Sequence, residues 1–225
     1  MPRTSRLHRI SNILYAPWRY GQRKGGVDEG AQRIQSIVND LVSNSHGSLS
    51  PHSHTVFIND NDNEQYHHEL YKARCKCYDN TLVAGGDHSV AIGSLLGSLR
   101  EFEETKPSAD SKLGVIWIDA HADINTLESS ESGNVHGMPL AFVTGIDRSW
   151  QWVNEVNLCL EFSDLYYWGI RDLDNFEIDT IDRYGIKVLS DAEEAMAIID
   201  DSRYGRIHTS LDIDGLDPRS CSLII

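Results

Sequence analysis

Short apolar runs alternate with stretches of helical apolar spacing along most of this chain. The runs predict strands at Ile13–Tyr15, Thr81–Ala84, Gly114–Ile118, Asp164–Ile170, Ile186–Leu189 and Arg206–Leu211. The helical spacing predicts helices at His88–Phe102 and Asp191–Ile199, the second with an acidic first turn and Ser190 as its cap. Strands that alternate with helices predict a parallel sheet with right-handed crossover connections.

Two segments break this pattern. Val42–Val56 is rich in Ser, Asn and His, and Asn59–Glu64 consists of Asn and acidic residues. Both compositions predict solvated surface loops. With 225 residues, 40% of them hydrophobic, the chain can bury one substantial core, and we expect a single domain over residues 1–225.

The overall charge and hydropathy exclude several partners. A net charge of −14 without a segregated basic patch argues against nucleic acid. Apolar runs such as Leu113–Ile118 are strand-sized, so we expect no membrane span, and no secretory signal is visible. Residues Met1–Val27 contain six Lys and Arg residues and no acid. We interpret them as a basic edge of the fold in a cytoplasmic protein, and a mitochondrial transit peptide is the alternative.

Residues that commonly bind metals follow three of the predicted strands. They are Asp87 and His88, then Asp119, His121 and Asp123, and finally Asp212 and Asp214. In the second and third groups they occupy alternate positions, which project to one side if the backbone stays extended. Because the carboxyl ends of parallel strands meet at one edge of a sheet, we expect the three groups to converge.

Each group alone is also explained by a turn, a helix cap or solvated acids. The proposed ligands are four carboxylates and two imidazoles, those of His88, Asp119, His121, Asp123, Asp212 and Asp214. At one edge of the sheet the like charges would repel and shift the pKa values of these groups unless cations lay among them. Two divalent ions would balance the four carboxylates. Oxygen-rich ligation without thiolate favours manganese over zinc. Paired ions roughly 3.5–4 Å apart activate a shared water, which predicts a hydrolase.

Six motifs occur in order along the chain: GQRKGGVDEG (21–30), GGDHS (85–89), DAHADIN (119–125), SGNVHGMP (132–139), GIRDLDNFE (169–177) and SLDIDGLDP (210–218). In sequence, order and approximate spacing they resemble the motifs of the arginase family of ureohydrolases. The fourth and fifth are typical of arginase rather than agmatinase. The resemblance implies a three-layer α/β/α fold with a mainly parallel sheet.

The resemblance also implies roles for individual residues. One Mn²⁺ ion would be held by His88, Asp119, Asp123 and Asp212, and the other by Asp119, His121, Asp212 and Asp214. Asp123 would orient the metal-bridging hydroxide. His136 would contact the substrate and shuttle protons, and a loop histidine near the site mouth is the alternative interpretation. The amino-acid end of the substrate would contact Asn125, Ser132, Asp174 and Glu177.

The chain departs from the family pattern after Pro218, where RSCSLII replaces the expected continuation. We therefore expect a form truncated at its C-terminus that lacks the last strands and helices and the Glu that recognises the guanidinium. Such a loss predicts weak or absent hydrolysis.

Three functional hypotheses follow. The first is manganese-dependent hydrolysis of L-arginine to L-ornithine and urea by a cytoplasmic homotrimer. The second is a non-catalytic isoform that binds metal or partner subunits. The third is a ureohydrolase acting on agmatine or another guanidino compound.

Overall fold

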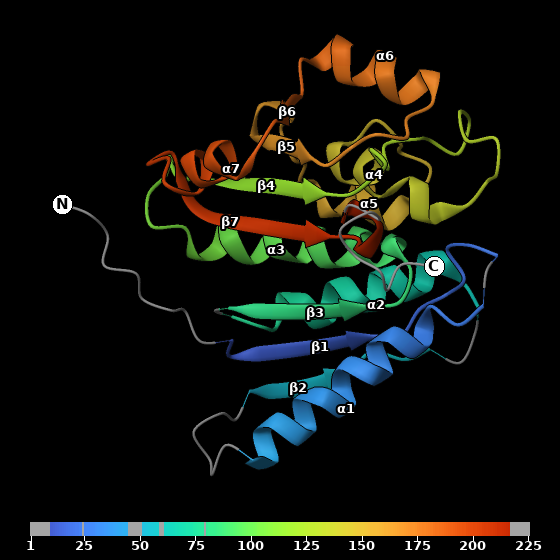
Figure 1. The fold of residues 1–225 in the computed structure, drawn as a ribbon, viewed down its shortest axis with the longest axis vertical. Coiled ribbons are helices and arrows are strands. Elements are labelled where there is room, and N and C mark those ends of the chain that lie inside the picture. The colour runs from blue at the N-terminus through green and yellow to red at the C-terminus, as the bar shows by residue number, and fades with distance from the viewer. Residues whose placement is uncertain (1–9, 24, 45–50, 59–60, 79, 217–225) are drawn as a thin grey trace.

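The computed structural model describes residues 10–23, 25–44, 51–58, 61–78 and 80–216 (Figure 1). Its strands form two groups in which every pairing is parallel. The first group has the order β2-β1-β3 and the second β6-β5-β4-β7. The strand bounds are β1 (Asn12–Ala16), β2 (His52–Thr55), β3 (Thr81–Gly85), β4 (Lys112–Ile118), β5 (Leu165–Trp168), β6 (Lys187–Leu189) and β7 (Tyr204–Leu211).

Helices cover both faces of these strands, as Figure 1 shows. Their bounds are α1 (Asp28–Asn44), α2 (Asn63–Cys75), α3 (Ala91–Thr105), α4 (Pro139–Thr144), α5 (Gln151–Val156), α6 (Asn175–Tyr184) and α7 (Ala192–Ile199). Single 3-10 turns lie at η1 (His88–Val90), η2 (Val135–Gly137), η3 (Phe162–Asp164) and η4 (Ile213–Gly215).

Alternating side chains on the strands create the three layers. On β4, Val115 and Trp117 pack with α3, α4 and α5, whereas Ile116 packs with α7 on the opposite face. On β1, Leu14 packs with α2, and its neighbour Ile13 belongs to the cluster that contacts α1. Burial of both faces is what parallel strands require, since their crossover helices cover each side. The three-layer α/β/α class is confirmed.

The predicted strands and both predicted helices are present with small shifts of their ends. The prediction that Val42–Val56 is wholly loop is wrong, because α1 runs to Asn44 and His52–Thr55 form β2. β2 has a polar sequence and exposed side chains, and backbone pairing with β1 holds it at the edge of the sheet, where apolar alternation is unnecessary. The predicted loop at 59–64 lies partly outside the described residues, and α2 begins at Asn63.

The N-terminal cap of α7 also differs from the prediction. Asp191, not Ser190, is the cap, because its side chain accepts a hydrogen bond from the backbone N–H of Glu194 at 2.9 Å. Ser190 instead donates its backbone N–H to the Glu194 carboxylate at 2.8 Å. Either residue type can cap a helix, so composition alone could not choose between neighbours.

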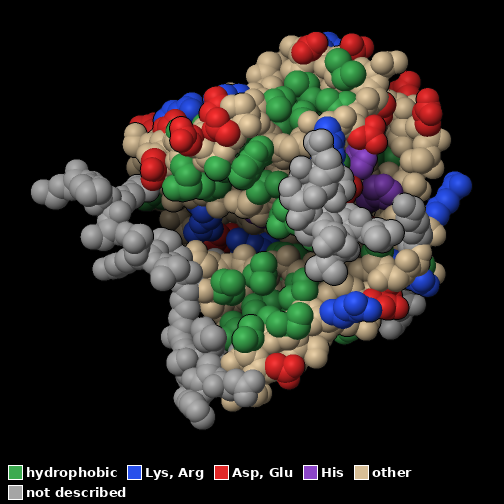
Figure 2. All heavy atoms as spheres, in the orientation of Figure 1, with side chains coloured by type: hydrophobic (Ala, Val, Ile, Leu, Met, Phe, Trp, Pro, Cys, Tyr) green, Lys and Arg blue, Asp and Glu red, His purple; other side chains and the backbone are tan. Residues whose placement is uncertain are grey.

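The facing sides of the two strand groups carry β3 and β7, which each have only one partner strand in the described chain (Figure 1). β3 pairs with β1 alone, and β7 with β4 alone. In Figure 2 a hollow separates hydrophobic side chains over the β7 and α7 region from others over the α1 and β3 region. The buried Glu101 of α3 forms ion pairs with Arg74 of α2 and with Arg206 of β7. These ion pairs connect the two halves of the molecule.

Among the described residues, no helix combines the length and apolar character needed to cross a membrane.

Candidate metal centre

The three groups of candidate ligands lie just beyond the carboxyl ends of β3, β4 and β7, as predicted. Backbone bonds hold the end of β4 to its two neighbours: Asp119 donates its N–H to the carbonyl of Trp168 at the end of β5 at 3.1 Å, and Asp212, just after β7, donates to the Ile118 carbonyl at 2.9 Å. Gly215 permits this approach, because a Cβ there would lie 2.8 Å from the backbone nitrogen of Asp119.

Three carboxylates surround one nitrogen of His88. Its Nδ1 lies 2.8 Å from Asp119 Oδ2, 3.0 Å from Asp123 Oδ2 and 3.4 Å from Asp212 Oδ2. The other nitrogen, Nε2, is 2.8 Å from the Ser210 hydroxyl, and the ring stacks on Trp117 with centroids 4.2 Å apart. Nδ1 therefore points at the acids, and the rest of the ring is fixed by its neighbours.

A second set forms around His121. Its Nδ1 lies 3.5 Å from Asp119 Oδ1 and 3.4 Å from Asp214 Oδ2. Asp119 thus directs one oxygen to each set, which is the arrangement of a ligand shared by two ions. The contact between Asp212 Oδ2 and His88 Nδ1 places Asp212 in the first set. That Asp212 is a second ligand shared by both ions stays a prediction.

The backbone through DAHAD is not extended. β4 ends at Ile118, the next residues bend, and Asp123 adopts a left-handed conformation with φ of 49°. The ligands therefore converge through a bend in the chain rather than through the strand alternation that the spacing suggested. A non-glycine residue with positive φ is held against backbone strain and is found preferentially at functional sites.

The pKa shifts of the clustered side chains indicate whether cations fit among them. Burial raises the pKa of Asp123 to about 7 and also raises that of Asp212. For His88, burial opposes the charged form, but the bonds to Asp119 and Asp123 prevail and raise its pKa to about 10. Bonds to Asp119 and Asp214 raise the pKa of His121 to about 11. Without ions, two imidazolium groups would have to supply the positive charge that the acids require, so the donor set fits divalent cations.

A second group of predicted residues lies at the start of α6. The Asn125 side-chain amide donates to Asp174 Oδ2 at 2.6 Å, and Asn125 Oδ1 accepts from Ser129 Oγ at 2.7 Å. Asp174 caps α6, and Glu177 completes a reciprocal capping box with it. Burial raises the pKa of Glu177. The structure therefore brings Asn125, Asp174 and Glu177 together.

Ser132 and His136 lie elsewhere in the same loop region. The Ser132 hydroxyl is exposed and accepts a hydrogen bond from the backbone N–H of Asn134 at 3.2 Å, and no described contact joins it to Asn125 or Asp174. His136 lies in η2 and is bound to the carbonyl of Gly21. Their proposed substrate contacts stay predictions.

The sequence interpretation did not identify Asp172 and Ser210 as site residues. Asp172 Oδ2 lies 3.6 Å from His121 Nε2, and Ser210 contacts the back of His88. Both belong to motifs already noted, Asp172 two residues before Asp174 and Ser210 two residues before Asp212. The same alternation that selected the acids could have found them.

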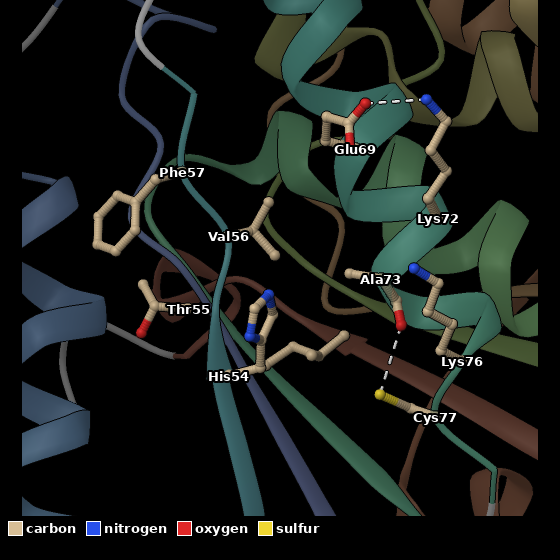
Figure 3. A pocket seen from close by; sticks show the side chains of 10 residues that line it. His54, Thr55, Val56, Phe57, Glu69, Lys72, Ala73, Lys76 and Cys77 are labelled. Atoms are coloured by element: carbon tan, nitrogen blue, oxygen red, sulfur yellow. Dashed lines mark hydrogen bonds and ion pairs between the residues drawn. The ribbon is translucent and has the colours of Figure 1, made fainter.

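A groove of about 510 Å³ between β2 and α2 is separate from this centre (Figure 3). Its walls carry His54, Lys72 and Lys76, and Lys72 forms an ion pair with Glu69 at 2.8 Å. None of the predicted site residues lines it, so the candidate site is assigned by side-chain chemistry rather than by concavity.

Parallel strands between helical layers, with two sets of Asp and His ligands that share one carboxylate, define an α/β protein with a candidate binuclear metal centre. The sequence profile described as the arginase family matches residues 11–222. The chain belongs to the arginase family.

Individual relatives agree with this assignment. An arginase of Entamoeba histolytica is 32% identical over 91% of this chain and 75% of its own length. An arginase of Coccidioides immitis is 40% identical, but the match covers 61% of this chain and only 46% of that relative, a little under half of its length. The solved structure of Entamoeba histolytica arginase in complex with L-ornithine superposes with a TM-score of 0.81 at 30% identity, covering 94% of this chain and 78% of that one.

Proposed function

We propose that this chain binds two Mn²⁺ ions and hydrolyses the guanidinium group of L-arginine to L-ornithine and urea. The observation that supports this proposal best is the convergence of His88, Asp119 and Asp123 beside a second set formed by Asp119, His121 and Asp214. The Entamoeba histolytica arginase was crystallised in complex with L-ornithine, which supports an amino-acid ligand for this fold.

Different residues of the chain have different roles in the proposed reaction. When bound, the paired ions supply Lewis-acid activation of a water molecule. His88, Asp119, Asp123 and Asp212 would hold one ion, and Asp119, His121, Asp212 and Asp214 the other. The Asp123 carboxylate accepts a hydrogen bond from the attacking water and orients it. His136 takes up a proton on its ring and passes it to the leaving amine. Asn125, Ser132, Asp174 and Glu177 bind the amino-acid end of the substrate.

Urea release tests the reaction and the substrate together. The purified chain loaded with Mn²⁺ is expected to release urea from L-arginine with a kcat/KM at least on the order of tenfold above that for agmatine, since agmatine leaves the polar groups for the α-carboxylate unpaired. Asp123→Asn is expected to abolish release, and the exposed Asp110→Asn to preserve it.

Metal quantification on the same samples separates the competing hypotheses. Two bound ions with no urea from either substrate would favour a non-catalytic metal-binding chain. Faster release from agmatine would assign a different ureohydrolase specificity.

A further inference from the structure

Gly21 is bound by two segments of the candidate site that are distant from it in sequence. Its N–H donates to Asp87 Oδ2 at 2.9 Å. Its carbonyl accepts two hydrogen bonds from His136, one from the backbone N–H at 3.0 Å and one involving the ring Nδ1 at 3.2 Å. Asp87 precedes the ligand His88, so one short chain of bonds runs from the metal centre to the ring of His136.

The bond to the carbonyl determines which nitrogen of His136 carries the proton. A backbone carbonyl can only accept, so Nδ1 must be the donor. A neutral imidazole has a single N–H, and Nε2 is therefore left with its lone pair. The ring is held in one tautomer, and the nitrogen available to take up a proton is Nε2.

Both carboxylate oxygens of Asp87 accept hydrogen bonds in this arrangement. The carboxylate is buried, and its Oδ1 accepts hydrogen bonds from both the backbone N–H and the hydroxyl of Ser89, while Oδ2 accepts from Gly21. A side chain at position 21 would displace these groups, because a Cβ on Gly21 would overlap the Asp87 carboxylate and the Ser89 side chain.

We propose that Asp87 and Gly21 are positioning residues that hold His136 as its Nδ1–H tautomer and so present Nε2 for proton transfer. The catalytic use of Nε2 rests on the proposed function. The tautomer itself is a property of the resting protein and is measurable without turnover.

The test is ¹⁵N NMR of the histidine rings in the full chain loaded with Mg²⁺, a diamagnetic oxygen-preferring ion, at about pH 9, where an ordinary imidazole is neutral. Assignment of His136 comes from His136→Gln. In the wild type we expect a protonated Nδ1 and an unprotonated Nε2. In Asp87→Asn an amide oxygen can face only one of the two sets of donors, so the bond to Gly21 is lost and a mixture of tautomers is expected.

Asp147→Asn is the matched control. Asp147 is equally buried and has the same bonding pattern, with Oδ1 accepting from the N–H and hydroxyl of Ser149 and Oδ2 accepting from the N–H of Leu127. It does not bond to Gly21, so its loss should leave the His136 tautomer unchanged. Gly21→Ala supplies a second variant with the effect expected of Asp87→Asn.

An Nε2–H tautomer in the wild type overturns the proposal, as does a pure Nδ1–H signal in both folded Asp87→Asn and folded Gly21→Ala. If the chain hydrolyses arginine, Asp87→Asn should also lower kcat on the order of tenfold with little change in KM. A fixed Nδ1–H tautomer in a chain that releases no urea would uphold the positioning and reject the proposed function alone.

Discussion

Asp119 connects the two halves of the candidate metal centre through its two carboxylate oxygens. One oxygen lies beside His88 and the other beside His121, and the residue is buried at the end of β4. Asp214 lies in the second set alone and is partly exposed. Removing each carboxylate should therefore have different consequences for metal binding.

We expect Asp119→Asn to bind almost no manganese and Asp214→Asn to retain about one ion per chain, because a shared ligand serves both sites and an unshared one serves a single site. Elemental analysis after gel filtration in Mn²⁺ gives the stoichiometry. Equal losses in the two variants would contradict a shared Asp119.

His67 shows a different effect of burial. Its side chain is fully buried, stacks on Trp150 with centroids 5.7 Å apart, and has no hydrogen-bond partner for either ring nitrogen. Burial lowers its pKa from 6.5 to about 3. The folded protein therefore keeps this ring neutral at pH values where the unfolded chain protonates it.

Since the unfolded state binds the extra proton, His67 destabilises the fold as pH falls below 6.5 toward 3, by about 1.4 kcal/mol per pH unit at most. His67→Phe should remove this slope from the free energy of unfolding measured by urea titration between pH 6.5 and pH 4. His68→Phe, on the same helix and only partly buried, should change the slope less. Equal slopes in the wild type and His67→Phe would refute the assignment.

At the scale of elements, helix starts position the site. α6 begins at a capping box formed by Asp174 and Glu177, and the same Asp174 carboxylate accepts the hydrogen bond from Asn125. α7 begins with a similar cap, Asp191, which has no such link to the site. Both aspartates therefore cap a helix, but only Asp174 also bonds to Asn125.

Asp174→Ala and Asp191→Ala should each lower the free energy of unfolding by about 0.5–2 kcal/mol, the usual cost of losing a cap. Only Asp174→Ala should also raise KM for L-arginine, because it removes a proposed substrate contact and also frees Asn125. Chemical denaturation and urea-release kinetics measure the two effects. A comparable rise in KM in both variants would show that general loosening, not the link to Asn125, is responsible.

At the scale of the whole molecule, apolar side chains are exposed on both sides of the boundary between the two strand groups. On α1, Ile37 is 59% exposed and Leu41 58%, and beyond β7 Ile213 is 63% exposed. β3 and β7 each present an unpaired edge within the described chain. Exposed apolar side chains beside open strand edges promote association.

We expect the average mass of the chain measured by light scattering to rise with concentration, and Ile37→Glu with Leu41→Glu to reduce that rise without lowering the thermal midpoint. Ile178→Glu, which places the same charge on an exposed position of α6, should have little effect. A mass that is independent of concentration and unchanged by the α1 substitutions would contradict this expectation.

The sequence by itself determined six strands, two helices, the α/β class and the identity of the ligand-type residues, because most buried parallel strands are apolar and the acids follow them directly. Val115 to Ile118 and Asp119 are the clearest case. Prediction from the sequence failed at β2, because backbone pairing at a sheet edge does not require apolar residues. It also failed at Ser190 and Asp191, because either neighbour could cap the helix.

Only the tertiary structure decided how the ligands meet. Asp123 adopts a left-handed backbone conformation. Gly215 lies against Asp119, and Gly21 bonds to Asp87 and His136. These contacts of the two glycines join segments far apart in the chain. The tautomer of His136 and the division of Asp119 between two sets depend on these approaches. Local residue spacing carries no information about them, since they arise from how separate strands and turns pack against one another.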